Sequence, residues 1–171
     1  MSVKQGWEGR YLEDFTVGDV YRAPIGRTIT EVDNTWFTLL TNNDNQIHFN
    51  DHYSSKTPWG KPLVNSAFTI AVVTGLGVRD LTMNGFALGW DKIRLPNPVF
   101  AGDTLYSQSE VLAVRESASD PKRGIITVRT LGIKQDGTVV VEFERSAMVW
   151  KRAHAPGNAT FPEPKPYKSQ L

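Results

Sequence analysis

The side chain best suited to acid–base chemistry is His48, in the stretch TNNDNQIHF at residues 41–49. Histidine gains and loses a proton near neutral pH more readily than other side chains, so it can act as general acid and general base. The residues before it are amides with one acid, Asp44, among them. The stretch is compatible with a proton-transfer loop and with ordinary surface polarity, and it does not show by itself which group would assist His48.

A metal site is the second chemistry to consider, because His48 and His52 are four residues apart. On a helix this spacing places two imidazoles on one face, where Asp44 or Asp51 could complete a ligand set. The sequence contains no separate cluster of further ligands and no cysteine. We therefore expect no metal.

The composition limits the kinds of molecule that this protein could bind and the compartment in which it is expected. Of 171 residues, 19 are basic and 18 acidic, which leaves a net charge of +1 and no field suited to nucleic acid or an anionic membrane. The absence of cysteine excludes disulfides and thiolate chemistry. The opening MSVKQGWEGR lacks an apolar signal region. We expect a single domain and a cytoplasmic location.

The longest apolar run, Val64–Val78, predicts the central helix of the domain. It is shorter than the roughly 20 residues that a membrane span requires. It is apolar or small on every side, so we expect a helix that is buried all round. Asn65 and Ser66 lie at its start, where polar side chains cap helices.

The N-terminal part predicts a strand over about 20–29, followed by a short helix within residues 30–41. Thr30 at the cap and Asp33 three residues later match a capping box. The periodicity indicates one apolar face on this helix, made of Val32, Trp36, Leu39 and Leu40. A second short, broken helix is expected before Pro58.

Four long strands are predicted after residue 84, and their polar alternation indicates an antiparallel sheet with one wet face. Asp136-Gly137 predicts a tight hairpin between the last two. The predicted strands are 85–96, 103–117, 123–135 and 138–152. One buried helix wrapped by such a sheet is an α+β hot-dog arrangement, expected as a single domain over 1–152 with a Pro-rich tail over 153–171.

Three segments resemble the MaoC-like dehydratases, a branch of the hot-dog superfamily that includes (R)-specific enoyl-CoA hydratases. They are the His48 loop, GKPLVNSAF at residues 60–68, and LPNPVFAGDTLYSQSEVL at residues 95–112. The likeness covers roughly residues 10–152. The opening GRYLEDFTVGDVY also looks like the stand-alone relatives of mesaconyl-CoA and β-methylmalyl-CoA hydratases.

The resemblance implies roles for the residues that match its motifs. His48 would be the acid/base that handles the protons of a water molecule. Ser66 would supply the backbone N–H that faces the thioester oxygen, and Asn65 takes the place of a second histidine. The family's water-binding aspartate lies five residues before the histidine, which here is Asn43; Asp44 is one place later.

This departure leaves three interpretations open. Asn43 orients the water while His48 handles the protons alone, since an amide cannot take a proton. Alternatively, a one-residue loop shift brings Asp44 inward, which Gln46 in place of the family's rigid proline would permit. In the third, hydration is lost and the site binds or hydrolyses thioesters.

The resemblance therefore implies an (R)-specific hydratase or dehydratase that adds water reversibly across the C2–C3 double bond of an enoyl thioester. Coenzyme A would be part of the substrate, no further cofactor is expected, and the working unit would be a homodimer or larger homo-oligomer. The rival functions are a hot-dog thioesterase and a catalytically silent acyl-CoA-binding subunit. If the acyl group is dicarboxylic, an inward arginine is expected, with Arg94 as the candidate.

Overall fold

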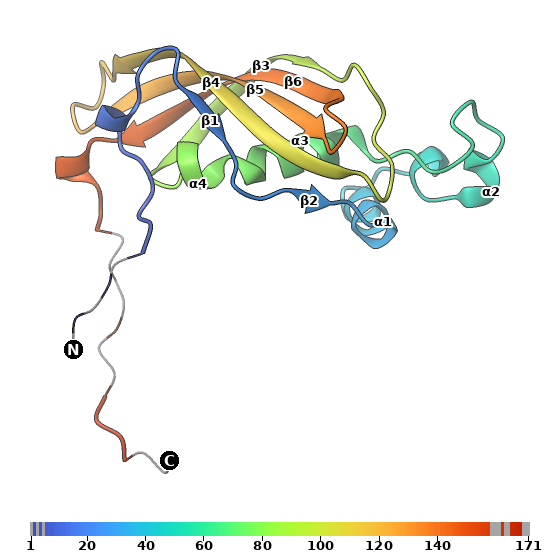
Figure 1. The fold of residues 1–171 in the computed structure, drawn as a ribbon, viewed down its shortest axis with the longest axis horizontal. Coiled ribbons are helices and arrows are strands. Elements are labelled where there is room, and N and C mark those ends of the chain that lie inside the picture. Colours follow the sequence, from blue (N-terminus) through green and yellow to red (C-terminus); the bar gives the residue numbers. More distant parts are fainter. Residues whose placement is uncertain (1, 3, 5, 158–161, 163–164, 169–171) are drawn as a thin grey trace.

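One antiparallel sheet forms the body of the protein (Figure 1). In this computed structural model the described residues are 2, 4, 6–157, 162 and 165–168. The strands run in the order β1-β4-β5-β6-β3, and β2 pairs with β4 beside β1. Their bounds are β1 Val20–Arg22, β2 Arg27–Thr28, β3 Gly85–Arg94, β4 Thr104–Glu116, β5 Arg123–Lys134 and β6 Val139–Trp150.

The central helix α3, Ser66–Leu76, lies along one face of this sheet and is followed by the short α4, Val78–Leu81 (Figure 1). Its buried side packs on the strands, with Val73 completely enclosed. The predicted α+β hot-dog fold and all four C-terminal strands are thus confirmed. Alternation in β4–β6 places one set of side chains under α3 and leaves the other set on the outer face.

Only one side of α3 is covered, so the prediction that it is buried all round is wrong for a single chain. Ala67, Ala71 and Gly75 are exposed and lie four residues apart, on one stripe of the helix. The sheet curves around the opposite side and cannot reach this stripe. A face of small residues on a largely apolar helix is therefore open to solvent.

The helix α1, Glu31–Leu40, begins as predicted, but its polar side is buried and its apolar side is exposed, which is the opposite of the prediction. Thr30 Oγ1 accepts a hydrogen bond from the Asp33 N–H at 3.1 Å, and the Asp33 carboxylate accepts one from the Thr30 N–H at 3.0 Å. Its buried residues are Asn34 and Thr38. The predicted apolar face is solvent-exposed, namely Val32, Trp36, Leu39 and Leu40.

The predicted strand over 20–29 is interrupted. Pro24 lacks the N–H that a sheet ladder needs, and Gly26 lies under the Tyr106 ring, where a Cβ atom would be 2.5 Å from Cε1. The chain therefore leaves the sheet after β1 and returns for the two residues of β2. The remaining short helices are η1 Leu12–Asp14, η2 Gln46–His48, α2 Asp51–Ser54 and η3 Arg152–His154.

The end of the domain is tied back to its start, because the Arg152 guanidinium pairs with the Asp14 carboxylate at 2.6 Å. The predicted Pro-rich tail begins at this point, and residues 158–161, 163–164 and 169–171 lie outside the described residues. The boundary at 152 stays a prediction. Within the described ranges, no helix is both long and apolar enough to cross a membrane.

The contact between α3 and the sheet is close at Gly132 of β5. A Cβ atom there would lie 2.5 Å from Val141 Cγ1 and 2.6 Å from Val73 Cγ2. Gly132→Ala should force these side chains apart and lower the free energy of unfolding by about 1–3 kcal/mol. Thermal unfolding checks this, with Gly89→Ala as the control, since a Cβ at Gly89 meets nothing within 4 Å. Equal melting temperatures for the two variants would contradict the tight contact.

Candidate active site

His48 ends the short η2 turn and is nearly buried, with 9% of its surface exposed. Its ring Nδ1 lies 2.8 Å from the Leu63 carbonyl oxygen. Because a carbonyl oxygen only accepts hydrogen bonds, Nδ1 carries the proton. This leaves the lone pair of a neutral imidazole on Nε2, which is the form that a general base requires.

The side chain of Asn34 connects the three segments around His48. Its Nδ2 donates to the His48 carbonyl at 2.7 Å and to the Leu63 carbonyl at 3.2 Å. Its Oδ1 accepts from the Asn65 N–H at 2.8 Å. Asn34 is 3% exposed. One buried amide therefore fixes the His48 turn, the strand-like segment before α3, and the N-terminus of α3 relative to one another.

Asn65 is the N-cap of α3, and Ser66 is its first residue. Asn65 Oδ1 accepts from the Ala67 N–H at 2.9 Å, and its Nδ2 donates to Thr38 Oγ1 at 3.3 Å. The cap is thus made by Asn65. The Ser66 N–H has no acceptor among the described residues, so a backbone donor at the positive end of the α3 dipole remains available to a ligand.

Asn43 and Asp44 differ in how they are placed. The Asn43 N–H donates to the Thr38 carbonyl at 3.0 Å, and its Oδ1 accepts from the Asn45 N–H at 3.0 Å, which forms a local turn. Its NH2 group makes no hydrogen bond to a described residue. Asp44 is exposed and has no hydrogen bond or ion pair with any described residue. The structure therefore anchors Asn43 within the loop and leaves Asp44 in solvent.

Two separate cavities adjoin these residues in the single chain. His48 lines one of about 130 Å³, together with two carboxylates that the motif does not include, Glu31 and Asp51, and with Lys61. Ser66 lines another, of about 210 Å³, between α3 and residues 95–99. Pro62 lines the first cavity, and the next two residues, Leu63 and Val64, line the second. Neither cavity is lined by Asn43 or Asp44.

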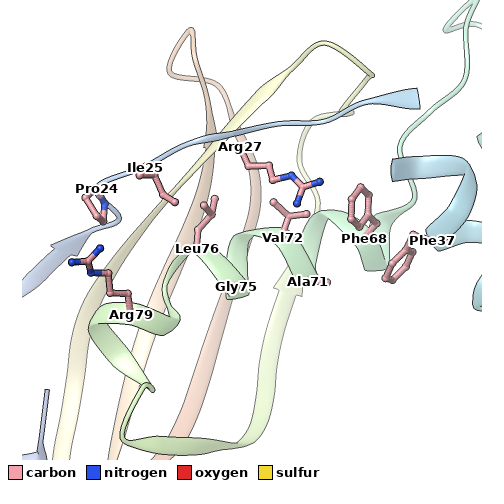
Figure 2. Close-up of a pocket in the computed structure, with 10 residues that line it drawn as sticks. All are labelled: Pro24, Ile25, Arg27, Phe37, Phe68, Ala71, Val72, Gly75, Leu76 and Arg79. Atoms are coloured by element: carbon pink, nitrogen blue, oxygen red, sulfur yellow. The ribbon is translucent and has the colours of Figure 1, made fainter. Parts of the chain in front are cut away.

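A larger apolar groove of about 460 Å³ runs along α3 (Figure 2). Phe68, Val72 and Leu76 line it from the helix, and Ile25 lines it from the link between β1 and β2. The Arg79 guanidinium is at the end of the groove beside Pro24. The groove has the apolar character and the basic end expected of a site for an elongated anionic molecule.

The other candidates lie apart from His48. Arg94, at the end of β3, lines a hollow of about 110 Å³ with Glu142 and Glu144. His52 is exposed, and its Nε2 is 2.9 Å from Lys56 Nζ. Over the ranges that the structure describes, no three His, Cys, Asp or Glu side chains gather as a metal site would require.

Asn34 and the Leu63 carbonyl were missed by the sequence analysis. Asn34 and Thr38 are one helical turn apart, and a polar pair opposite an apolar face is the usual pattern of a solvated side. The backbone carbonyl of Leu63 has no signal in a sequence at all. The one available signal was the position of Asn34, because an asparagine in a helix interior is unfavourable without a specific partner.

Comparison with known proteins identifies the family. The sequence matches the family described as mesaconyl-CoA hydratase over residues 3–163. It is 31% identical over 158 residues to the mesaconyl-CoA hydratase of Cereibacter sphaeroides, a match that covers 91% of this chain and 46% of that protein. It is 32% identical over 151 residues to the β-methylmalyl-CoA dehydratase of Chloroflexus aurantiacus, covering 84% of this chain and 41% of that protein.

The fold comparison agrees. A solved MaoC domain protein from Chloroflexus aurantiacus superposes with a TM-score of 0.82 at 29% identity, covering 96% of this chain and 47% of that one. The chain thus spans about half the length of the curated relatives that it matches. With the family match over almost all of its length, the chain belongs to the mesaconyl-CoA hydratase family of MaoC-like hot-dog proteins.

Proposed function

We propose that this protein hydrates the C2–C3 double bond of an enoyl-CoA, reversibly and with (R) stereochemistry, and that branched dicarboxylic thioesters such as mesaconyl-CoA are among its substrates. The observation that carries the proposal is that two prepared groups are held beside the N-terminus of α3 by the same buried amide, Asn34. His48 has Nδ1 fixed on the Leu63 carbonyl, so that Nε2 carries the lone pair in the neutral ring, and the Ser66 N–H is without an acceptor among the described residues. The names of the matched relatives support the substrate class.

In the proposed reaction, water loses a proton to His48 Nε2 while its oxygen attacks C3. The negative charge that develops on the thioester oxygen is stabilised by the Ser66 N–H. C2 then takes up the proton that His48 received from the water, which returns the histidine to its starting form. Loss of one such backbone donor typically costs on the order of 10²–10³ in rate. The reaction transfers a proton and a hydroxyl group and no net electrons, so we propose that it needs neither a metal nor a redox cofactor.

His48→Ala should lower kcat/KM for hydration by on the order of 10²–10⁴, because the base is lost while the oxyanion donor remains. The measurement is the fall in absorbance of the conjugated thioester, followed together with free thiol, over short, medium-chain and branched dicarboxylic enoyl-CoAs. His52→Ala is the control, because that side chain is exposed and bonded to Lys56.

Free thiol appearing with the fall in absorbance would instead identify a thioesterase. Binding of acyl-CoA with no reaction in the unaltered protein would identify a silent binding subunit. Neither rival is favoured by the placement of His48, since a binding module has no need of a histidine with a fixed tautomer.

The loop residue that assists His48 can be assigned by exchanging amide and acid. Asn43→Asp should raise the hydration rate about tenfold or more, because one carboxylate oxygen can keep the Asn45 N–H bond while the other accepts a proton. Asp44→Asn should change the rate by less than about twofold, since Asp44 is exposed. A large loss in Asp44→Asn would show that the loop rearranges and that Asp44 is the working acid.

We also propose that the working unit is a homodimer in the cytoplasm, with two sheets joined at β3. This strand has β6 as its only neighbour in the described sheet, and it exposes large apolar side chains, namely Phe86, Leu88, Trp90 and Ile93. An open edge of this kind needs a partner. A second copy would also cover the small-residue stripe of α3, and would supply the second half that the longer relatives carry in one chain.

Leu88→Lys should weaken this dimer by tenfold or more, because a lysine on an edge strand opposes pairing. Sedimentation equilibrium of the purified protein checks the result. Val20→Lys, a similarly exposed position on the opposite edge strand β1, should leave the dimer intact. A unit that stays dimeric in Leu88→Lys and dissociates in Val20→Lys would place the interface at β1 instead.

A further inference from the structure

The apolar groove along α3 is separate from the two cavities beside His48 and Ser66. Its volume of about 460 Å³ is within the range of roughly 300–1,000 Å³ that small-molecule sites have. Phe68, Val72 and Leu76 line it, and their spacing of four residues puts them on one face of the helix. None of the ten residues that line this groove lines either of the two cavities. The groove therefore needs an explanation of its own.

The groove exists because the link between β1 and β2 is tied to the sheet and not to α3. The Ala23 N–H donates to the Ser107 carbonyl of β4 at 2.9 Å. Three residues later, Gly26 lies so close to the ring of Tyr106, also on β4, that a Cβ atom there would not fit. Between these two contacts, Ile25 forms the wall opposite the helix (Figure 2). The groove is thus made by the course of the backbone, and a ligand would find it already formed.

Aromatic rings lie at one end of the groove and a cation lies at the other (Figure 2). The Phe37 and Phe68 rings have their centroids 5.0 Å apart, where α1 meets the first turn of α3. The Arg79 guanidinium is at the far end, beside Pro24. Apart from Arg27, the residues between the two ends are apolar or small. A ligand that fills the groove therefore needs an apolar body.

The two arginines that line the groove differ in their partners. The Arg27 guanidinium pairs with the Asp33 carboxylate at 2.7 Å. The Arg79 guanidinium forms no hydrogen bond or ion pair with any described residue, while its backbone carbonyl accepts a hydrogen bond from Trp7 Nε1 at 3.1 Å. No carboxylate of the described residues lines the groove. An anionic head group beside Arg79 is therefore the charge that complements this end.

The proposed dimer would leave this groove open, because β1 and β3 are at opposite edges of the sheet. Trp90 and Ile93 of β3 face the other side of α3, across a separate cavity of about 510 Å³. Ala71 and Gly75 line both hollows, so they form the ridge between them. A second copy at β3 would cover the β3 side of this ridge and leave the side that faces Ile25 accessible.

We propose that the groove is a binding site for a free fatty acid, with the hydrocarbon chain along α3 and the carboxylate on Arg79. From Phe68 to Leu76 the helix rises about 12 Å, and an extended chain advances about 1.2 Å per bond, so the site fits roughly ten carbon atoms. One guanidinium suffices for this head group, because its planar fork matches the two carboxylate oxygens. The site is independent of the proposed function, since neither His48 nor Ser66 lines it.

Isothermal titration of the full chain with decanoate and with 1-decanol tests the charged end of the site. The two molecules have chains of the same length, and only decanoate carries a charge. The unaltered protein should bind one decanoate per chain, more tightly than 1-decanol. Arg79→Met should weaken decanoate binding about tenfold and change 1-decanol binding less than about twofold. Arg129→Met is the matched control, since Arg129 is exposed on the outer face of β5 and pairs with Glu110.

Val72→Phe tests the apolar part of the site. The larger side chain takes up room in the groove, so decanoate and 1-decanol should both bind about tenfold or more weakly. Val78→Phe is the control, because Val78 is exposed and does not line the groove. Equal affinities in Val72→Phe and Val78→Phe would place the ligand elsewhere and overturn the inference.

The other outcomes that would overturn the inference identify what the groove does instead. If the unaltered protein shows no saturable binding of decanoate, or if Arg79→Met binds it equally well, Arg79 is an ordinary solvated charge. Displacement of decanoate by coenzyme A would place the carrier of the proposed substrate in the groove. Dissociation of the dimer in Val72→Phe, seen by sedimentation equilibrium, would show that a second copy occupies it.

Discussion

The candidate site depends on one buried amide. Asn34 uses both of its polar atoms to hold three backbone groups, two carbonyls and one N–H, that belong to segments distant in the sequence. Without Asn34 the His48 carbonyl and the Asn65 N–H would lose their partner, at a cost of about 1–3 kcal/mol apiece, whereas the Leu63 carbonyl would keep its bond from His48 Nδ1. The position of His48 relative to the start of α3 is therefore set by hydrogen bonds rather than by apolar packing. This suits a site in which proton transfer requires an exact placement of donors and acceptors.

The sheet has a different role, because it supplies stability and carries neither His48 nor Ser66. Strands β4, β5 and β6 follow one another as hairpins, and their inward side chains supply more than half of the buried residues of the two apolar clusters. The site residues lie on α1, η2 and the start of α3, all of which come before β3 in the chain. The protein is thus divided along its sequence into an N-terminal part that holds the candidate site residues and a C-terminal part that supports them.

The parts predicted correctly are those in which local sequence determines structure. The turn at Asp136-Gly137 and the alternation in the strands define the meander, and the Thr30–Asp33 capping box defines the start of α1. The predictions fail where the structure depends on which surfaces of distant segments pack against each other. The periodicity of α1 reveals an apolar face and does not show whether the sheet covers it. In the structure that face is exposed and the polar Asn34 side is buried.

The burial of Arg145, which is 3% exposed, could have been predicted from the alternation of side chains along β6. It has the same parity along β6 as Phe143 and Ala147, so alternation alone places it under α3. The roles of Asn43 and Asp44 are of another kind, because they would depend on the water and the substrate of the proposed reaction. The loop's own hydrogen bonds show only that Asn43 is anchored.

The division of the chain has a consequence for the order in which the molecule is assembled. The hairpins of β4–β6 can begin at pairs next to their turns, Glu116 with Gly124 and Ile133 with Val139, and extend from there. The Asn34 bonds to Leu63 and Asn65 instead close loops of 29 and 31 residues in one step. We expect the sheet to form first and the bonds around His48 to form last. The proposed activity would then appear only in the completed fold, and partly folded chains would present a sheet without the candidate site.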